Sequence, residues 1–127
     1  MKVRKSMRNL NRSLIAVLSG AAMLLASPYS FADYGCTGTV GYLGISSDGR
    51  VTVALTNVTP VHLICSIEQQ GTFTMSVPSC KATYAAFLAA RLAGKTMVVY
   101  YHETGLTCAT LPSWGAVPSV YFVEGPN

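Results

Sequence analysis

Hydrophobic and polar residues alternate along the chain after residue 32, and this alternation predicts three β-strands. Residues 36–46 mix Gly and Thr with larger side chains and end near Asp48-Gly49, a pair that favours a hairpin turn. In residues 50–57 three aliphatic side chains alternate with small or polar ones, so one face of this strand is expected to be buried. Residues 61–68 form the third predicted strand.

The spacing of the larger apolar residues then changes to that of a helix, which is predicted over residues 78–93. Ser76 suits the N-cap, and Gly94 suits the position after the last helical turn. One stripe of larger side chains at helical spacing is expected to face the core. Its members are Cys80, Tyr84, Phe87, Leu88 and Leu92.

Residues 96–103 and 119–123 are rich in β-forming residues and predict two more strands, separated by a loop. The resulting order, β-β-β-α-β-β, predicts a mainly β domain. Two architectures accommodate it. One is a small OB-fold-like Greek-key barrel, with its helix between the third and fourth strands. The other is an α+β sheet with the helix on one face. We favour the OB-like barrel.

Residues 1–32 have the three parts of a secretory signal peptide. A basic region precedes an uncharged apolar run at 14–26, and small residues at Ser30 and Ala32 suit a cleavage site. A membrane anchor is the alternative, but the run is shorter than the roughly 20 residues that a span needs. We therefore expect cleavage after about Ala32, leaving a single periplasmic or secreted binding domain, residues 33–127, without a membrane span.

Removal of the leader changes the charge of the protein. The chain has nine Lys and Arg and five Asp and Glu, and five of the basic residues lie in the leader. Residues 33–127 keep four basic and five acidic side chains, a net charge of −1. Nucleic-acid binding needs clustered Lys and Arg to neutralise phosphates, so that function class is excluded.

The four cysteines all belong to the predicted mature domain, which favours two disulfides in an oxidising compartment. A zinc site is disfavoured because no Cys-x-x-Cys pair occurs, and no metal or other cofactor is expected. Four cysteines allow three pairings. In an OB topology the fourth strand lies antiparallel beside the first, which brings Cys108 to Cys36. The third strand can then place Cys65 beside Cys80, at the start of the helix.

The side of the predicted helix opposite the core stripe is lined by alanines instead of the usual charged residues. They are Ala82, Ala86, Ala89 and Ala93. Two interpretations remain open. Alanine is the best helix former, which is reason enough for its presence. An apolar helix face also suits close packing against another subunit, which predicts a homo-oligomer.

No catalytic motif is present, and the protein is not expected to be an enzyme. His102 and Glu103 are adjacent on a strand, so their side chains point to opposite faces and cannot act together. His62 has no ligand-spaced partner and is expected to face solvent. No Gly-x-Ser-x-Gly sequence is present to support a serine hydrolase.

Aromatic residues are the candidates for ligand binding. Trp114, the only tryptophan, lies in the loop before the last strand, and an indole face can stack on a sugar. The alternative is that Trp114 closes the barrel end over a Cys36–Cys108 disulfide. Tyr42, Tyr100 and Tyr101 are further candidates of the same kind.

Several features of the region from Cys80 to Trp114 resemble those of a known family. These features are a cystine before the helix, Tyr84 within it, the step Gly94-Lys95-Thr96-Met97-Val98, and the pair Tyr100-Tyr101. Together they resemble the B subunits of AB5 toxins, particularly the subtilase-cytotoxin and pertussis-like branch. Such subunits are OB-folds that form pentameric rings around a helix-lined pore and bind host glycans. The segment before the helix does not match the glycan-binding strand of the family, so no sugar-binding residue is carried over.

The sequence therefore predicts an exported, non-enzymatic, OB-like binding module that is oligomeric and recognises a glycan or a protein. The alternative is a stand-alone periplasmic inhibitor or an envelope structural protein. No nucleic-acid partner is expected.

Overall fold

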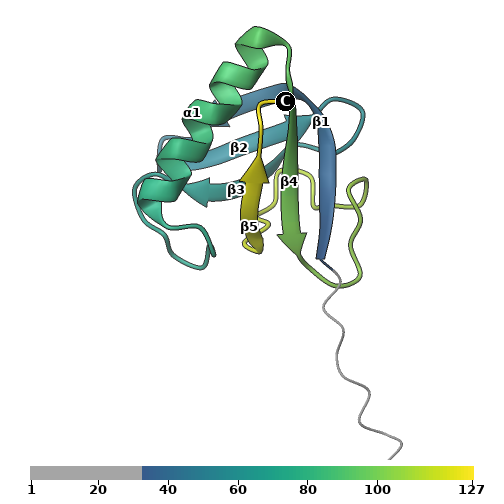
Figure 1. Cartoon of the computed structure of the whole chain (residues 1–127). Coiled ribbons are helices and arrows are strands. Elements are labelled where there is room, and N and C mark those ends of the chain that lie inside the picture. Colours follow the sequence, from purple (N-terminus) through teal and green to yellow (C-terminus); the bar gives the residue numbers. More distant parts are fainter. Residues whose placement is uncertain (1–32) are drawn as a thin grey trace, which may run out of the picture. The chain divides into compact units, whose positions relative to one another are not determined.

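The computed structural model describes residues 33–127, and the expected leader lies outside the described residues. Six elements follow in the order β-β-β-α-β-β, as predicted (Figure 1). Their bounds are β1 (Asp33–Ile45), β2 (Arg50–Leu55), β3 (His62–Ser66), α1 (Val77–Ala93), β4 (Thr96–His102) and β5 (Val120–Glu124).

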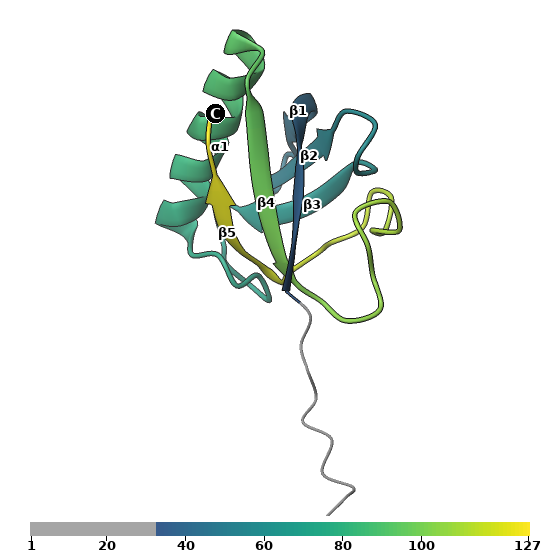
Figure 2. The ribbon, with the colours of Figure 1, turned by 45° about the vertical axis from the view of Figure 1, so that its right-hand side comes forward.

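The strands form one five-stranded sheet in the order β3-β2-β1-β4-β5, and every neighbouring pair is antiparallel. The long strand β1 is shared between two partners. Its first part, from Asp33 to Thr39, pairs with β4, and its second part, from Val40 to Ile45, pairs with β2. The sheet therefore changes direction along β1, and β2 and β3 run across the direction of β4 and β5 (Figure 2).

The turn between β1 and β2 is the predicted hairpin. The amide of Gly49 donates to the carbonyl of Ser46 over 2.9 Å, and Gly49 has a φ of +79°. Glycine adopts this left-handed conformation without the steric cost that a side chain brings. The Asp-Gly pair thus sets the position of the turn and the register of both strands.

The helix begins and ends at the predicted caps. Ser76 is the N-cap, and its hydroxyl accepts a hydrogen bond from the amide of Ser79 over 3.4 Å. Gly94 follows the last turn with a φ of 64°, the conformation for which glycine is preferred after a helix. The helix packs on β1, β3 and β4.

The face that the helix turns to the core differs from the predicted stripe. Cys80 and Phe87 are buried as expected, and Ala90 is buried as well. Leu88 and Leu92 are 41% and 81% exposed, so their assignment to the core is wrong. The disulfide at Cys80 and the small side chain of Ala90 determine which face of α1 packs on the sheet. The two leucines lie outside that face.

The core lies between the helix and the inner face of the sheet. Its fully buried members from the strands include Val51, Val53, Ile64, Met97 and Val99. Two disulfides link strands of this core to other segments of the chain. Their pairing is the one favoured from the predicted topology. Cys36–Cys108 joins β1 to the segment between β4 and β5, and Cys65–Cys80 joins β3 to α1.

The segment before β5 lies along β3. Leu63 and Ala116 form an isolated parallel bridge. The amide of Leu63 donates to the carbonyl of Gly115 over 2.9 Å, and the amide of Val117 donates to the carbonyl of Leu63 over 2.8 Å. The outer side of β3 is therefore hydrogen-bonded at Leu63, even though the sheet itself ends at β3.

Candidate functional site

The four aromatic residues predicted to bind a ligand lie at three different places. Tyr42, on β1, contacts Trp114 in the segment between β4 and β5. Tyr100 points away from the core on β4, whereas the next residue, Tyr101, is fully buried. Tyr42 and Trp114 thus form one candidate surface and Tyr100 belongs to another, while Tyr101 offers no surface to a ligand.

Tyr42 and Trp114 meet edge to face, with ring centroids 5.5 Å apart and an interplanar angle of 76°. The indole is 62% exposed and the phenol ring is 38% exposed. The interpretation of Trp114 as a buried cover over the Cys36–Cys108 disulfide is therefore wrong. The two rings form an exposed right-angled corner, with an apolar ring face available to a flat partner.

The main chain holds Trp114 firmly. Its amide donates to the carbonyl of Val61 over 2.6 Å, and its own φ is 57°, an uncommon value for a residue with a side chain. The following residues bond to β3 at Leu63, and the Cys36–Cys108 disulfide anchors the same segment upstream. The indole is thus presented by a tethered segment, which lowers the entropic cost of ordering it on binding.

A second aromatic surface lies on the outer face of β4 and β5, where three rings gather. The ring of Tyr100 lies 5.6 Å from Phe122 and 6.4 Å from Tyr121. Phe122 is 53% exposed and Tyr121 is 45% exposed. Sequence reasoning missed both because strict alternation would have buried one of two consecutive strand residues. A β-bulge in the pairing of β4 with β5 breaks that alternation.

Charged groups border this second surface at both ends. The hydroxyl of Tyr100 donates to a carboxylate oxygen of Glu124 over 3.2 Å, and this hydrogen bond raises the pKa of Tyr100. At the other end, Nδ1 of His102 pairs with the carboxylate of Asp33. His102 also lies edge to face with Tyr121 at 6.3 Å. The aromatic surface is thus flanked by an acidic group and by an imidazole–carboxylate pair.

Tyr101 belongs to a buried polar chain in the core. Its hydroxyl lies 2.7 Å from Nε2 of His62, and Nδ1 of His62 lies 2.8 Å from the carbonyl oxygen of Pro60. A carbonyl only accepts, so Nδ1 carries the proton and the Tyr101 hydroxyl donates to Nε2. His62 is fully buried, so the expectation that it faces solvent is wrong. Every residue of β3 is buried, since the segment after β4 covers the side that the core leaves open.

Burial governs the ionisation of this chain. It lowers the pKa of His62, against a smaller opposing effect of the hydrogen bond to Pro60. It raises the pKa of Tyr101 far above its usual value, and the nearby Tyr34 hydroxyl adds to the shift. Tyr34 stacks on Tyr101 with ring centroids 5.4 Å apart. Both shifts favour the neutral forms of His62 and Tyr101 at physiological pH.

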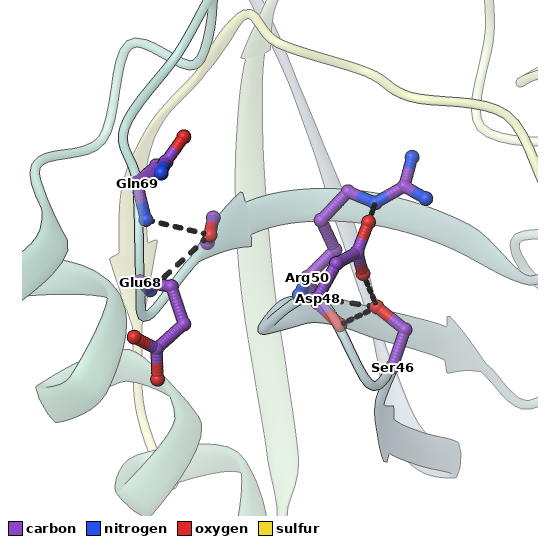
Figure 3. A network of polar contacts seen from close by, with 6 residues as sticks. Ser46, Asp48, Arg50, Glu68 and Gln69 are labelled. Atoms are coloured by element: carbon purple, nitrogen blue, oxygen red, sulfur yellow. Dashed lines mark hydrogen bonds and ion pairs between the residues drawn. The ribbon is translucent and has the colours of Figure 1, made fainter.

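A polar hollow of about 710 Å³ lies beside the β1–β2 turn. Asp48 forms an ion pair of 2.6 Å with Nε of Arg50 and a hydrogen bond with the hydroxyl of Ser46 (Figure 3). On the facing segment the amides of Glu68 and Gln69 both donate to the Ser66 hydroxyl. Sequence reasoning placed Asp48 in the turn but gave none of the lining side chains a role in a site, because the hollow forms only when the turn meets the end of β3.

The alanines of α1 lie mostly on its exposed side. Ala82, Ala89 and Ala93 are exposed, whereas Ala86 is half-buried against the core. Because Leu88 and Leu92 are exposed on the same helix, the apolar face is larger than the alanine spacing alone indicated. This face is available to a second subunit.

Within residues 33–127 no group of three or more His, Cys, Asp or Glu side chains is arranged to hold a metal ion. None of the helices in this described part is long and apolar enough to cross a membrane. The structure pairs His102 with Asp33, a residue of β1 that is distant from it in sequence.

Comparisons with family models, with curated proteins and with solved structures find no match for this chain.

Proposed function

We propose that this chain is an exported, non-enzymatic binding module that recognises a glycan through the exposed pair Tyr42 and Trp114. The observation that carries the proposal is the exposure and attachment of Trp114. An indole that is 62% exposed, on a segment tied by a disulfide and by hydrogen bonds to β3, forms a preorganised stacking surface. Large amphipathic rings of this kind dominate recognition surfaces.

The proposed architecture is an OB-like Greek-key barrel. The parallel hydrogen bonds between β3 and residues 115–117 support it, because they connect the two ends of the sheet order through the segment that leads into β5. In an OB-fold the loop between the fourth and fifth strands is one of the binding loops. Here that loop carries Trp114, which agrees with the proposed site.

The resemblance to AB5 B subunits supports a homo-oligomer. The exposed apolar side of α1, with Ala82, Ala89 and Leu92, is the proposed subunit contact. An uncovered apolar helix face is uncommon in a soluble monomer.

A glycan array with the domain of residues 33–127, followed by titration of each positive glycan, tests recognition. Trp114→Ala should weaken binding at least about fivefold, as expected for loss of a central aromatic anchor. Phe122→Ala is the matched control, because it removes another exposed ring while leaving the Tyr42–Trp114 corner intact. A blank array, or equal affinity of Trp114→Ala and the wild type, rejects the glycan proposal.

Size-exclusion chromatography with light scattering tests the helix contact. The double variant Ala82→Glu/Ala89→Glu places charges on the exposed face without touching the core. An oligomer that falls to the monomer mass in this variant supports the contact. An unchanged mass rejects it.

A further inference from the structure

The outer face of β4 and β5 carries an aromatic platform, formed by Tyr100, Tyr121 and Phe122. Tyr100 lies opposite Gly35 on β1 and opposite Phe122 on β5. A Cβ on Gly35 would lie 3.0 Å from Cε1 of Tyr100, so the phenol ring rests over the backbone of β1. Tyr121 and Phe122 are each about half exposed and lie beside this ring. The platform is therefore supported by the sheet and open to solvent.

A carboxylate at the border of the platform has no cationic partner. Glu124 is exposed, and its Oε2 accepts a hydrogen bond from the Tyr100 hydroxyl over 3.2 Å. Among residues 33–127 neither a Lys nor an Arg forms an ion pair with Glu124, and its second oxygen accepts no hydrogen bond. A negative charge thus stands beside the exposed rings.

The strands that build the platform are acidic. Residues 33–39, 96–103 and 120–124 contain Asp33, Glu103 and Glu124 but no Lys or Arg. Cleavage after Ala32 would add an α-amino group at Asp33, whose carboxylate already pairs with His102. Glu124, at the other end, is therefore the carboxylate available to a partner. A cation is attracted to a surface of this kind.

We propose that the aromatic platform and Glu124 bind an arginine side chain of another protein. A cation is attracted to the face of an aromatic ring, and a neighbouring carboxylate can accept charge-assisted hydrogen bonds from the same group. This inference goes beyond glycan recognition and uses neither Trp114 nor the exposed face of α1.

The arrangement of the rings favours a guanidinium over a compact ammonium group. The planes of Tyr121 and Phe122 are tilted by 52° and 45° from that of Tyr100, so the rings form an open surface instead of a cage. Quaternary ammonium groups are recognised by rings that surround them. A planar guanidinium can stack on one ring face while its N–H groups reach a carboxylate beside that ring.

Titration of the domain of residues 33–127 with the peptide acetyl-Gly-Arg-Gly-amide, followed by nuclear magnetic resonance, tests the proposal. Amides of β4 and β5 should shift with a common dissociation constant. Glu124→Gln removes the charge but keeps an oxygen that can accept from Tyr100, and it should weaken binding about two- to fivefold. Phe122→Leu should weaken binding to a similar extent, because it removes the ring and keeps an apolar side chain. Glu68→Gln is the matched control: it removes the same charge elsewhere on the surface and should bind like the wild type.

Three further probes decide between the possible partners. The same peptide with citrulline in place of arginine should cause no saturable shift, and the lysine peptide and choline should bind more weakly than the arginine peptide. An equal response to citrulline, no response to arginine, or unchanged affinity in Glu124→Gln overturns the proposal. Tighter binding of choline or lysine overturns the choice of a guanidinium.

Failure of this inference can be distinguished from failure of the glycan proposal. Trp114→Ala should bind the arginine peptide like the wild type, whereas its glycan affinity reports on the Tyr42–Trp114 corner. Loss of peptide binding in Trp114→Ala would place the arginine site at that corner and overturn the platform.

Discussion

The hydroxyl of Tyr101 donates a hydrogen bond to Nε2 of His62 over 2.7 Å inside the core. This contact connects β4 with β3, two strands that are not neighbours in the sheet. His62 immediately follows Val61, whose carbonyl accepts the amide of Trp114. The buried pair thus fixes the part of β3 on which the Trp114 segment rests.

We expect the stability of the domain to fall with pH below about 6.5 because of His62. Burial lowers the pKa of His62 in the folded state. Below the unfolded pKa, the unfolded chain binds a proton that the folded chain does not, so the free energy of unfolding decreases as pH falls. It decreases by up to about 1.4 kcal/mol per pH unit, until the folded pKa is reached. Above pH 6.5 both states are neutral at this residue and the effect disappears.

Urea unfolding between pH 7.5 and pH 5.5 measures this effect. The control is His62→Phe/Tyr101→Phe, which removes both partners and leaves no buried hydroxyl unsatisfied at this contact. The wild type should lose more stability over this range than the double variant. Equal losses would show that His62 does not carry the pH dependence.

The two disulfides should stabilise the domain unequally. Cys36 and Cys108 are 72 residues apart, whereas Cys65 and Cys80 are 15 apart. In the chain-entropy model a longer loop restricts the unfolded state more, and the longer bridge should contribute about 1.3 kcal/mol more. Urea unfolding of Cys36→Ser/Cys108→Ser and Cys65→Ser/Cys80→Ser compares them. A larger loss in the second variant would contradict the entropic account.

Local signals in the sequence predicted the elements of the fold well. The Asp48-Gly49 turn and the caps Ser76 and Gly94 depend on a few adjacent residues, and the structure has all of them as predicted. The side of the helix that faces the core was predicted less well. That orientation depends on the disulfide between Cys80 and Cys65 of β3. The spacing of apolar residues within the helix does not reveal a bond to another strand.

The candidate site was predictable only in its residue types. A lone Trp in a loop indicated a binding surface, but its partner Tyr42 is distant in sequence and only the fold brings the two together. His62 and Tyr101 looked like strand residues open to solvent or ligand, but both are fully buried. Residues 114–117 lie along the strand that carries His62, and Tyr101 packs in the core against Tyr34 and His62. Exposure in this small domain is decided by tertiary packing as much as by alternation.

Two residues of α1 with the same predicted role should respond differently to truncation. Phe87 is fully buried, so Phe87→Ala should cost about 3–5 kcal/mol of unfolding free energy. Leu92 is 81% exposed, so Leu92→Ala should change stability by no more than about 0.5 kcal/mol. Denaturant midpoints at a single pH measure both. A large cost at Leu92 would mean that another surface covers it in solution.

Gly49 and Gly71 allow backbone strain to be separated from steric conflict. Both have positive φ, 79° and 55°, so an alanine at either position adopts a left-handed conformation at a cost of about 1–2 kcal/mol. A Cβ on Gly71 would meet nothing within 4 Å, whereas a Cβ on Gly49 would lie 2.3 Å from Cγ of Glu68. Gly49→Ala should therefore destabilise the domain more than Gly71→Ala, because Glu68 has to move as well. Urea unfolding of both variants measures the difference, and nuclear magnetic resonance should show amide shifts at Glu68 only in Gly49→Ala. Equal stabilities with an unperturbed Glu68 would show that the turn relaxes without involving the polar hollow.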